Sequence, residues 1–398
     1  MHEGCRRVLL AVAATGAFEA APAAGQSSAV IYGRLYPELV LARTSGATAP
    51  GQPVATMQAL PTGGRERVSA LEASNSRLGL RGSEALGAGL EVIWQIEQAI
   101  AVDAGGGALA SRDTFIGFKS DRLGTARLGN LDTVYKNAGD TVSFLGVSSG
   151  NFVSISNLLS KSNLSDTSAA SFHLRRANSV VFESSERHGF GFAIQYSPDE
   201  LRSAARNADL WSLGVTFDRG PLYLAAAYER HDDFFGGSRA SRSDLRNDAD
   251  PNARSRDEAL RLTAQYRFGA HTLEANHARL RYRERGGGPG RFGEYASDRW
   301  SIAWDARWGG PWRTSMAYSG ANDGTCTLLG GAACSTAGLH GHMIAAGAGY
   351  TLSRRTMLFA MAAHLANGRS ALFNNAESLT PAVGARITQA AVGMLHSF

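Results

Sequence analysis

Apolar and polar residues alternate along most of the chain from residue 28 onward, a pattern typical of β-strands whose two faces meet different surroundings. The clearest example spans residues 299–308. Its apolar face carries Trp300, Ile302, Trp304, Ala306 and Trp308, and the opposite face carries Arg299, Ser301, Ala303, Asp305 and Arg307. Strands of soluble sandwiches usually have about five or six residues, whereas these have about ten, enough to cross a bilayer at a tilt. The pattern therefore predicts membrane-spanning strands.

The same criterion marks sixteen segments. They are residues 29–42, 76–83, 90–100, 112–119, 125–129, 178–184, 190–197, 210–217, 222–230, 259–268, 272–283, 298–308, 312–319, 342–352, 357–366 and 386–398. Connections after even-numbered segments are short, and several of those after odd-numbered segments are long. An even strand number with short turns at one end and long loops at the other is typical of outer-membrane barrels. The predicted fold class is all-β, a 16-stranded antiparallel transmembrane β-barrel.

The segment 130–174 interrupts this pattern. Its 45 residues show no sustained strand or helix periodicity and contain no proline. Loops of that length inside a compact domain are usually functional or disordered. Nine Val, Phe, Ile and Leu residues between positions 142 and 159 argue against a solvated linker. We therefore expect the segment to fold into the barrel as the third long loop and to act as a constriction loop.

The first residues have the layout of a secretory signal peptide. Arg6 and Arg7 precede an apolar run at 8–14 and a small-residue stretch at 20–25. The apolar run is too short to span a bilayer as a helix. We predict a signal peptide at residues 1–25 and a barrel domain at 26–398.

Two cysteines remain in the predicted mature chain. Cys326 and Cys334 have seven residues between them, and in an exported protein such a pair most often forms a local disulfide. We predict no metal site, because two sulfurs without further spaced ligands rarely bind a metal. Since no nucleophile elbow or glycine-rich phosphate loop precedes a helix, we also predict no cofactor and no enzymatic activity.

The formal net charge of +5 fits nucleic acid, an anionic membrane surface or a path for anions. Export makes nucleic acid the wrong partner. The outer-membrane lipids remain as the expected surroundings of the barrel. Whether the positive charge forms a path for anions depends on where the basic residues lie.

Alternation places several arginines on the face turned away from lipid. Arg34 shares a face with Tyr32 and Tyr36, and the same argument turns Arg77, Arg112 and Arg127 inward. An arginine on the lipid face costs about 2 to 4 kcal/mol near the midplane, which favours the inward side. We expect these four side chains to line the pore.

Five motifs resemble those of the Gram-negative general porins. They are VIYGR at 30–34, SRLGLRGSEALGAGL at 76–90, FIGFK at 115–119, GTARLG at 124–129 and the terminal Phe398. The resemblance runs from about residue 28 to the C-terminus. It implies a homotrimer of 16-stranded barrels, each with an inward third loop. It also implies a basic ladder matching Arg34, Arg77 and Arg112, with Arg176 as a fourth member.

The terminal alternation ending at Phe398 resembles the signal by which the barrel assembly machinery recognises such proteins. Two departures from the family pattern bear on selectivity: the family often has Gly-Arg where this chain has Gly129-Asn130, and the acidic tip of the inward loop is missing. Residues 144–151 lack the acidic tip of the family's inward loop, so Asp132 and Asp140 are the remaining acidic candidates there. Asp113 is also unusual, because alternation turns it outward beside Phe115, where either a contact with another subunit or a wrong register is needed to explain it. Arginines that face few acids predict an anion preference.

The sequence thus predicts an outer-membrane porin for passive diffusion of small hydrophilic solutes and ions. Two alternatives stay open. One is a channel specific for an anionic nutrient, and the other is a barrel whose external loops bind a partner on another cell.

Overall fold

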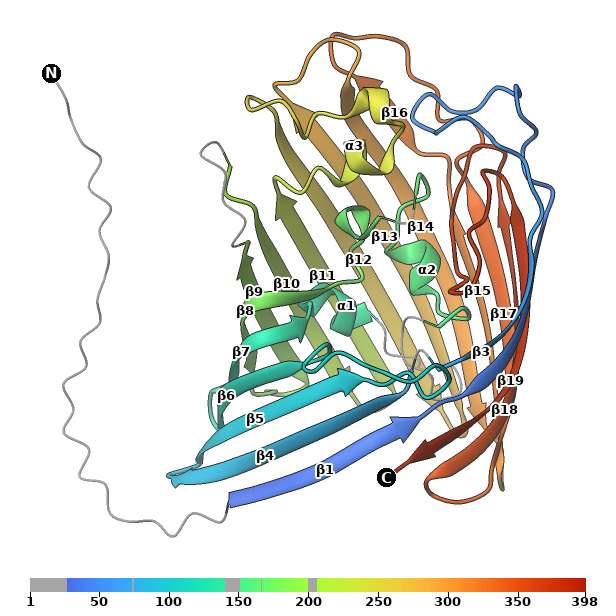
Figure 1. Ribbon diagram of the computed structural model, residues 1–398. Coiled ribbons are helices and arrows are strands. Elements are labelled where there is room, and N and C mark those ends of the chain that lie inside the picture. Colours follow the sequence, from blue (N-terminus) through green and yellow to red (C-terminus); the bar gives the residue numbers. More distant parts are fainter. Residues whose placement is uncertain (1–26, 74, 140–150, 166, 200–205) are drawn as a thin grey trace, which may run out of the picture.

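The computed structural model describes residues 27–73, 75–139, 151–165, 167–199 and 206–398 (Figure 1). The predicted signal peptide lies outside this part of the chain, and so does Asp140.

The described residues form nineteen strands in one antiparallel sheet. In the first half these are β1 (Ser27–Leu35), β2 (Glu38–Ser45), β3 (Arg67–Glu72), β4 (Arg77–Gly87), β5 (Leu90–Ala99), β6 (Thr114–Ser120), β7 (Gly124–Asp132), β8 (Arg175–Ser184), β9 (Phe190–Pro198) and β10 (Asp209–Arg219). The others are β11 (Leu222–Asp232), β12 (Arg254–Phe268), β13 (His271–Arg285), β14 (Phe292–Arg307), β15 (Trp312–Ala321), β16 (Thr325–Leu328), β17 (Gly341–Thr351), β18 (Thr356–Asn367) and β19 (Arg386–Ser397).

Three of the sixteen membrane crossings are made of two strands each. Pro37 separates β1 from β2, because proline has no backbone N–H to donate to a ladder. β3 ends at Glu72 and β4 begins at Arg77, and Gly324, with a φ of 73°, precedes β16. Counting each such pair as one crossing gives the closed 16-stranded barrel that the alternation predicts.

The last strand closes the barrel against the first crossing. β19 pairs with β2 from Arg386 to Gly393 and then with β1 at its end. The backbone of Phe398 continues this ladder, since its N–H donates to the Gly33 carbonyl at 3.1 Å and its carbonyl accepts from Gly33 at 3.2 Å. The C-terminal residue therefore takes part in closure.

The two faces of the wall differ as the alternation predicts. On β12, Leu260 and Leu262 are 46% and 49% exposed on the outside, whereas Arg261 between them is 1% exposed on the inside. Burial of the inner face shows that other parts of the chain fill this side of the interior. In the described residues, no helix is long and apolar enough to cross a membrane.

The described parts of the segment between β7 and β8, residues 133–139, 151–165 and 167–174, lie inside the barrel, as predicted (Figure 1). It contains α1 (Val134–Gly139), α2 (Ser156–Leu159) and a 3-10 turn at Ser168–Ala170. A second insertion after β11 contains α3 (Gly236–Ala240) and a 3-10 turn at Ser243–Leu245.

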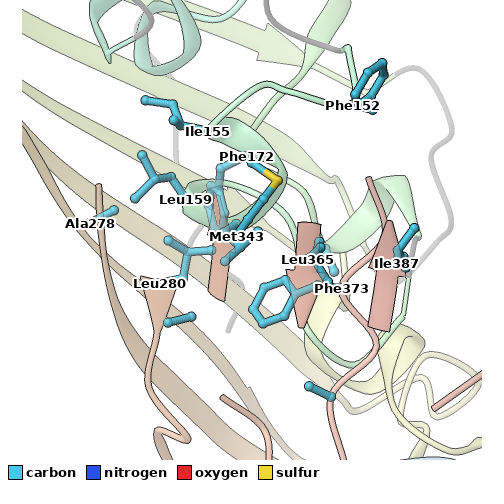
Figure 2. Close-up of a cluster of buried hydrophobic side chains, with 14 of the residues drawn as sticks. Phe152, Ile155, Leu159, Phe172, Ala278, Leu280, Met343, Leu365, Phe373 and Ile387 are labelled. Carbon is cyan, nitrogen blue, oxygen red and sulfur yellow. The ribbon is translucent and has the colours of Figure 1, made fainter. Parts of the chain in front are cut away.

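Apolar side chains of the inner loop hold it against the wall (Figure 2). Phe152 and Leu159 are buried in one cluster with Leu280 of β13, Met343 of β17 and Leu365 of β18. Fully burying such a side chain contributes about 1.5 to 3 kcal/mol. The described apolar residues of the loop thus have the packing role expected from the sequence, whereas Val142, Phe144, Leu145 and Val147 lie outside the described residues.

Candidate functional site: a charged inner wall beside the loop

Three arginines meet on the inner face of the first strands. Arg34 of β1 and Arg77 of β4 are directly opposite each other in the β1–β4 ladder. Arg112 reaches the same place from the segment just before β6, and its Nε lies 2.5 Å from Glu97 Oε1. The three predicted ladder arginines are therefore brought together.

Glu97 on β5 is the carboxylate at the centre of this cluster. Arg77 Nε lies 3.6 Å from its Oε2, and Tyr32 donates its hydroxyl to the same oxygen at 2.9 Å. The side chain of Glu97 is only 10% exposed, so these contacts replace much of its hydration. With Arg34, Arg77 and Arg112, the cluster has three positive charges and one negative, which leaves two net positive charges.

A second ionic network lies at the start of the inner loop. Arg175, the first residue of β8, places Nε 2.6 Å from Asp113 and Nη2 2.8 Å from Asp132. Lys136 of α1 also contacts Asp132 at 2.8 Å. Asp132, a predicted acidic site residue, therefore bridges two cations. Its charge and that of Asp113 balance those of Arg175 and Lys136.

The prediction that Asp113 turns outward is wrong. β6 begins only at Thr114, so strict alternation does not extend back to Asp113. Phe115 also lies on the inner side, where it packs against Leu131 and Val134 and beneath Arg127. Asp113 is half-buried and paired with Arg175, so no contact with another subunit is needed to explain its charge.

The other two predicted arginines are paired elsewhere. Arg127 Nη2 lies 2.6 Å from Glu183 Oε2 on the neighbouring strand β8. Arg176 Nη2 lies 3.7 Å from Asp199, and its guanidinium covers the ring of Phe234 at 4.7 Å. Arg175, rather than Arg176, is thus the residue of this pair that faces Asp113 and Asp132.

An acidic pair lies on the loop side of the arginines. Glu38 of β2 and Glu72 of β3 are direct partners in their ladder and are 1% and 7% exposed. Asn151 of the inner loop donates its amide to Glu38 at 2.7 Å, and Ser378 donates its hydroxyl to Glu72. Along this wall the interior therefore changes from acidic to basic within a few residues.

Buried arginines of the opposite wall hold the inner loop in place. Arg299 of β14 donates to the carbonyl of Leu158 at 2.7 Å and also to that of Lys161. Arg261 of β12 donates to the carbonyl of Gly139 at the end of α1. Hydrogen bonds from charged donors contribute about 1.5 to 3 kcal/mol each. The loop is thus fixed at both helices.

Some site residues were missed at the sequence level. Glu97 could have been found, because Gln95 and Glu97 alternate with Ile96 on a clear strand. Arg175 was missed because the resemblance pointed to its neighbour Arg176. Alternation read backwards from the buried Ser179 and Val181 leads to Arg175, although Asn178 has a φ of 57° and the β7–β8 register shifts next to it.

Outside the barrel interior, the structure joins Cys326 to Cys334 by a disulfide, with a Cα–Cα distance of 5.8 Å. The bond ties β16 to the segment that follows it. Within the described ranges, no group of three or more His, Cys, Asp or Glu residues is arranged to hold a metal ion.

A closed antiparallel barrel with an apolar outer face, a charged inner wall and a loop folded into its interior defines a channel-type protein of the outer membrane. Comparison with known proteins identifies the family. The Gram-negative porin family matches residues 9–370. The chain therefore belongs to the Gram-negative porins, in agreement with the resemblance of its motifs.

Curated relatives match a shorter part of the chain. The major outer membrane protein P.IB of Neisseria lactamica is 25% identical over 231 residues, which cover 51% of this chain and 65% of that protein. Its counterpart in Neisseria gonorrhoeae is 28% identical over 160 residues, covering 39% of this chain and 42% of that protein. The chain thus matches less than two thirds of the length of these relatives.

Solved structures share the fold over nearly the whole chain. An anion-selective porin from Comamonas acidovorans has a TM-score of 0.68 at 18% identity and covers 94% of this chain and 100% of its own. A trimer form of OmpT from Vibrio cholerae has a TM-score of 0.59 at 14% identity, covering 94% and 99%. At these identities the likeness shows the barrel fold alone.

Proposed function

We propose that this porin is a water-filled channel through which small hydrophilic solutes and ions diffuse passively, with a preference for anions. The cluster of Arg34, Arg77 and Arg112 around Glu97 carries the proposal, because it puts two net positive charges on the inner wall. Charges at the narrowest part of a channel determine which ions enter. We assign these three arginines to the constriction, with Asp132 at the beginning of the loop.

The charges at the start of the inner loop leave this sign unchanged, and the acidic pair Glu38 and Glu72 is buried and hydrogen-bonded to Asn151 and Ser378. Asp113 and Asp132 are neutralised by Arg175 and Lys136. Arg127 and Arg176 each have a carboxylate partner, so they add little net charge. The anion-selective porin of Comamonas acidovorans has the same fold, but at low identity the selectivity of this chain rests on its own arginines.

The test is the reversal potential of the reconstituted protein in a planar bilayer with a potassium chloride gradient. We expect the sign of an anion-selective channel. The triple variant Arg34→Gln, Arg77→Gln, Arg112→Gln should shift the potential toward cation selectivity. A matched control, Arg122→Gln, Arg354→Gln, Arg355→Gln, removes the same charge from exposed turns and should keep the wild-type value. Cation selectivity of the unaltered protein would contradict the proposal.

A channel specific for an anionic nutrient is the second candidate. Guanidinium groups bind carboxylates and phosphates through paired hydrogen bonds, and three of them converge next to the hydroxyl of Tyr32. A general pore conducts in proportion to the bulk salt concentration. A specific channel is blocked by low concentrations of its solute, which inorganic phosphate and a small dicarboxylate can probe.

We also propose that the protein assembles as a homotrimer. A structural neighbour, OmpT of Vibrio cholerae, is known in a trimer form. Native mass measurement in mild detergent tests this proposal, and a monomer as the only species would contradict it.

A further inference from the structure

The segment between β11 and β12 also enters the barrel, at the end that carries the long loops (Figure 1). We call residues 233–253, which include α3, the entrance segment. Its backbone is held by inward carboxylates of the wall. The N–H of Gly236 donates to Asp257 at 2.9 Å, and that of Ser238 donates to Glu284 at 2.8 Å. Asp257 and Glu284 are 0% and 5% exposed, so the entrance segment covers the inner face of these strands.

The entrance segment packs directly on the inner loop. α3 lies against the 3-10 turn at Ser168–Ala170, where a Cβ atom added to Gly236 would come within 2.5 Å of the Ala169 carbonyl oxygen and 2.9 Å of Ala170 Cα. The two segments therefore touch backbone to backbone, at a distance that excludes a side chain. Tyr282 of β13 supports the same place, because its hydroxyl donates to the Ala170 carbonyl at 2.6 Å. The inner loop and the entrance segment thus share one contact surface.

Three stacked rings form a second connection between the two segments. Phe172 of the inner loop stacks on His231 of β11 with ring centroids 4.6 Å apart. His231 in turn stacks on Phe234 of the entrance segment at 4.7 Å. Phe172 and His231 are 0% exposed and Phe234 is 7% exposed. His231 is therefore a wall residue that contacts both segments at once.

The orientation of the His231 ring depends on these two phenylalanines. Its Nε2 lies 2.9 Å from Oε1 of Glu229, which precedes it by two residues on the same inward face. Within the described part of the chain, its Nδ1 has no hydrogen-bond partner. One contact at the edge of a ring does not fix its plane, so the stacking partners do. Loss of either phenylalanine should consequently weaken the support of the other.

The backbone on both sides of Phe234 has an unfavourable conformation. Asp233 has a φ of 60° and Phe235 has a φ of 56°. The left-handed region is uncommon for residues other than glycine, and for a bulky residue it is an outlier. Such residues persist where the surrounding structure enforces them, often at functional positions. Here the two turns place the ring of Phe234 on His231.

We propose that the entrance segment and the inner loop form one constriction unit, in which His231 is the positioning residue that joins them. The inference rests on the proposed channel function and adds a second segment that determines the width of the channel. Phe172 also belongs to the buried cluster that holds the inner loop against the wall (Figure 2). A displacement of Phe234 therefore reaches the side chains that fix the loop.

A double-mutant cycle in single-channel recordings of the reconstituted protein tests this coupling. Phe172→Ala and Phe234→Ala should each raise the occupancy of a wider, more conducting state by up to about tenfold, the effect of one aromatic pair on an equilibrium constant. The double variant should show little more than the larger single effect, because either change already breaks the stack. Two independent segments would give the product of the single effects.

Further variants distinguish this role from a general loss of packing. His231→Ala should behave like the double variant. His231→Phe combined with Glu229→Gln keeps a ring between the two phenylalanines and removes the carboxylate that would lose its partner, so it should restore most of the wild-type behaviour. Phe190→Ala is the control, because it removes one ring of a pair on the outer face, with centroids 4.8 Å apart, and should leave the current unchanged.

Amide hydrogen exchange of the unaltered protein gives a test that needs neither a variant nor a conducting channel. The Arg239 N–H donates to the Phe235 carbonyl at 2.9 Å, and the Phe172 N–H donates to the Ser160 carbonyl at 2.8 Å. If the two segments open as one unit, these amides should have the same opening free energy.

Two results would overturn the proposal. One is a double variant whose effect equals the product of the single effects. The other is protection of the inner-loop amide that persists after protection of the entrance segment is lost. Absence of current through the unaltered protein would contradict the channel function instead, and the exchange measurement would still decide whether the two segments form one unit.

Discussion

Arg175 Nε lies 2.6 Å from Asp113 Oδ1, which joins the first residue of β8 to the residue before β6. The same guanidinium holds Asp132 at the end of β7. One side chain thus connects the beginning of the inner loop to its end and to a third strand. We expect the position of the loop to depend on this connection.

The substitution Arg175→Gln should loosen the inner loop. It removes charged contacts to Asp113 and Asp132, and we expect a loss of about 2 kcal/mol in the free energy of unfolding. Single-channel records should also show more frequent fluctuations of the ionic current as the loop moves. Arg279→Gln is the control, because its ion pair with Asp298 is exposed and contributes about 0 to 1 kcal/mol. Equal noise in both variants would show that Arg175 does not hold the loop.

Removing the negative charge of Glu97 should strengthen the anion preference. Glu97→Gln leaves Arg77 and Arg112 without their carboxylate partner and adds one net positive charge to the wall. One charge about 4 Å from an ion in water contributes about 1 kcal/mol. The ratio of anion to cation permeability should therefore rise by about two- to fivefold. Reversal potentials measure it, and Glu294→Gln on the outer face should leave the ratio unchanged.

Arg299→Met should widen the channel. The guanidinium is completely buried and donates to two carbonyls around α2, so methionine leaves those oxygens unsatisfied. We expect about 3 kcal/mol less stability and a larger single-channel conductance as this part of the loop detaches. Arg299→Lys keeps the charge but concentrates its donors on one nitrogen in place of the planar fork. Its stability and conductance should lie between those of the wild type and the methionine variant. A methionine variant with wild-type conductance would mean that other contacts hold the loop.

The external segment after β15 should loosen in acid. Burial acts to raise the pKa of Asp323, but hydrogen bonds from the His340 ring and from backbone N–H groups of His340 and Gly338 lower it below its ordinary value. A carboxylate with a lowered pKa stabilises the fold above its unfolded pKa of about 4. That contribution is lost as the pH falls through the folded value.

Amide hydrogen exchange checks this prediction. At pH 6 the His340 amide, which lies 2.7 Å from Asp323 Oδ1, should be better protected in the wild type than in Asp323→Asn. The difference between the two proteins should vanish near pH 3. A difference that persists in acid would show that the carboxylate charge is not what holds the segment.

The sequence predicts the barrel well because each crossing repeats one physical rule many times. On β12 five consecutive outward positions are apolar, so the two-residue alternation would remain recognisable even if one of them were polar. Arg34 and Arg77 were placed correctly for the same reason, since both lie within strands of regular alternation. The inward loop was predictable from its length and its apolar content.

The finer parts of the site depend on irregular backbone, which alternation cannot describe. Asp113 precedes its strand, and the resemblance named Arg176 where the structure has Arg175 in contact with Asp113 and Asp132. The loop anchors Arg261 and Arg299 look like ordinary inward residues in the sequence. Only the path of the loop shows what they bind.

The anchors of the inner loop have a consequence for biogenesis. The loop ends at residue 174, but Arg261 and Arg299 follow it by about ninety and more than a hundred residues. While the first strands pair, β12 and β14 have not yet been added to the sheet, so Arg261 and Arg299 cannot hold the loop. The loop can therefore reach its final position, and the channel its final width, only after β12 and β14 have joined the sheet.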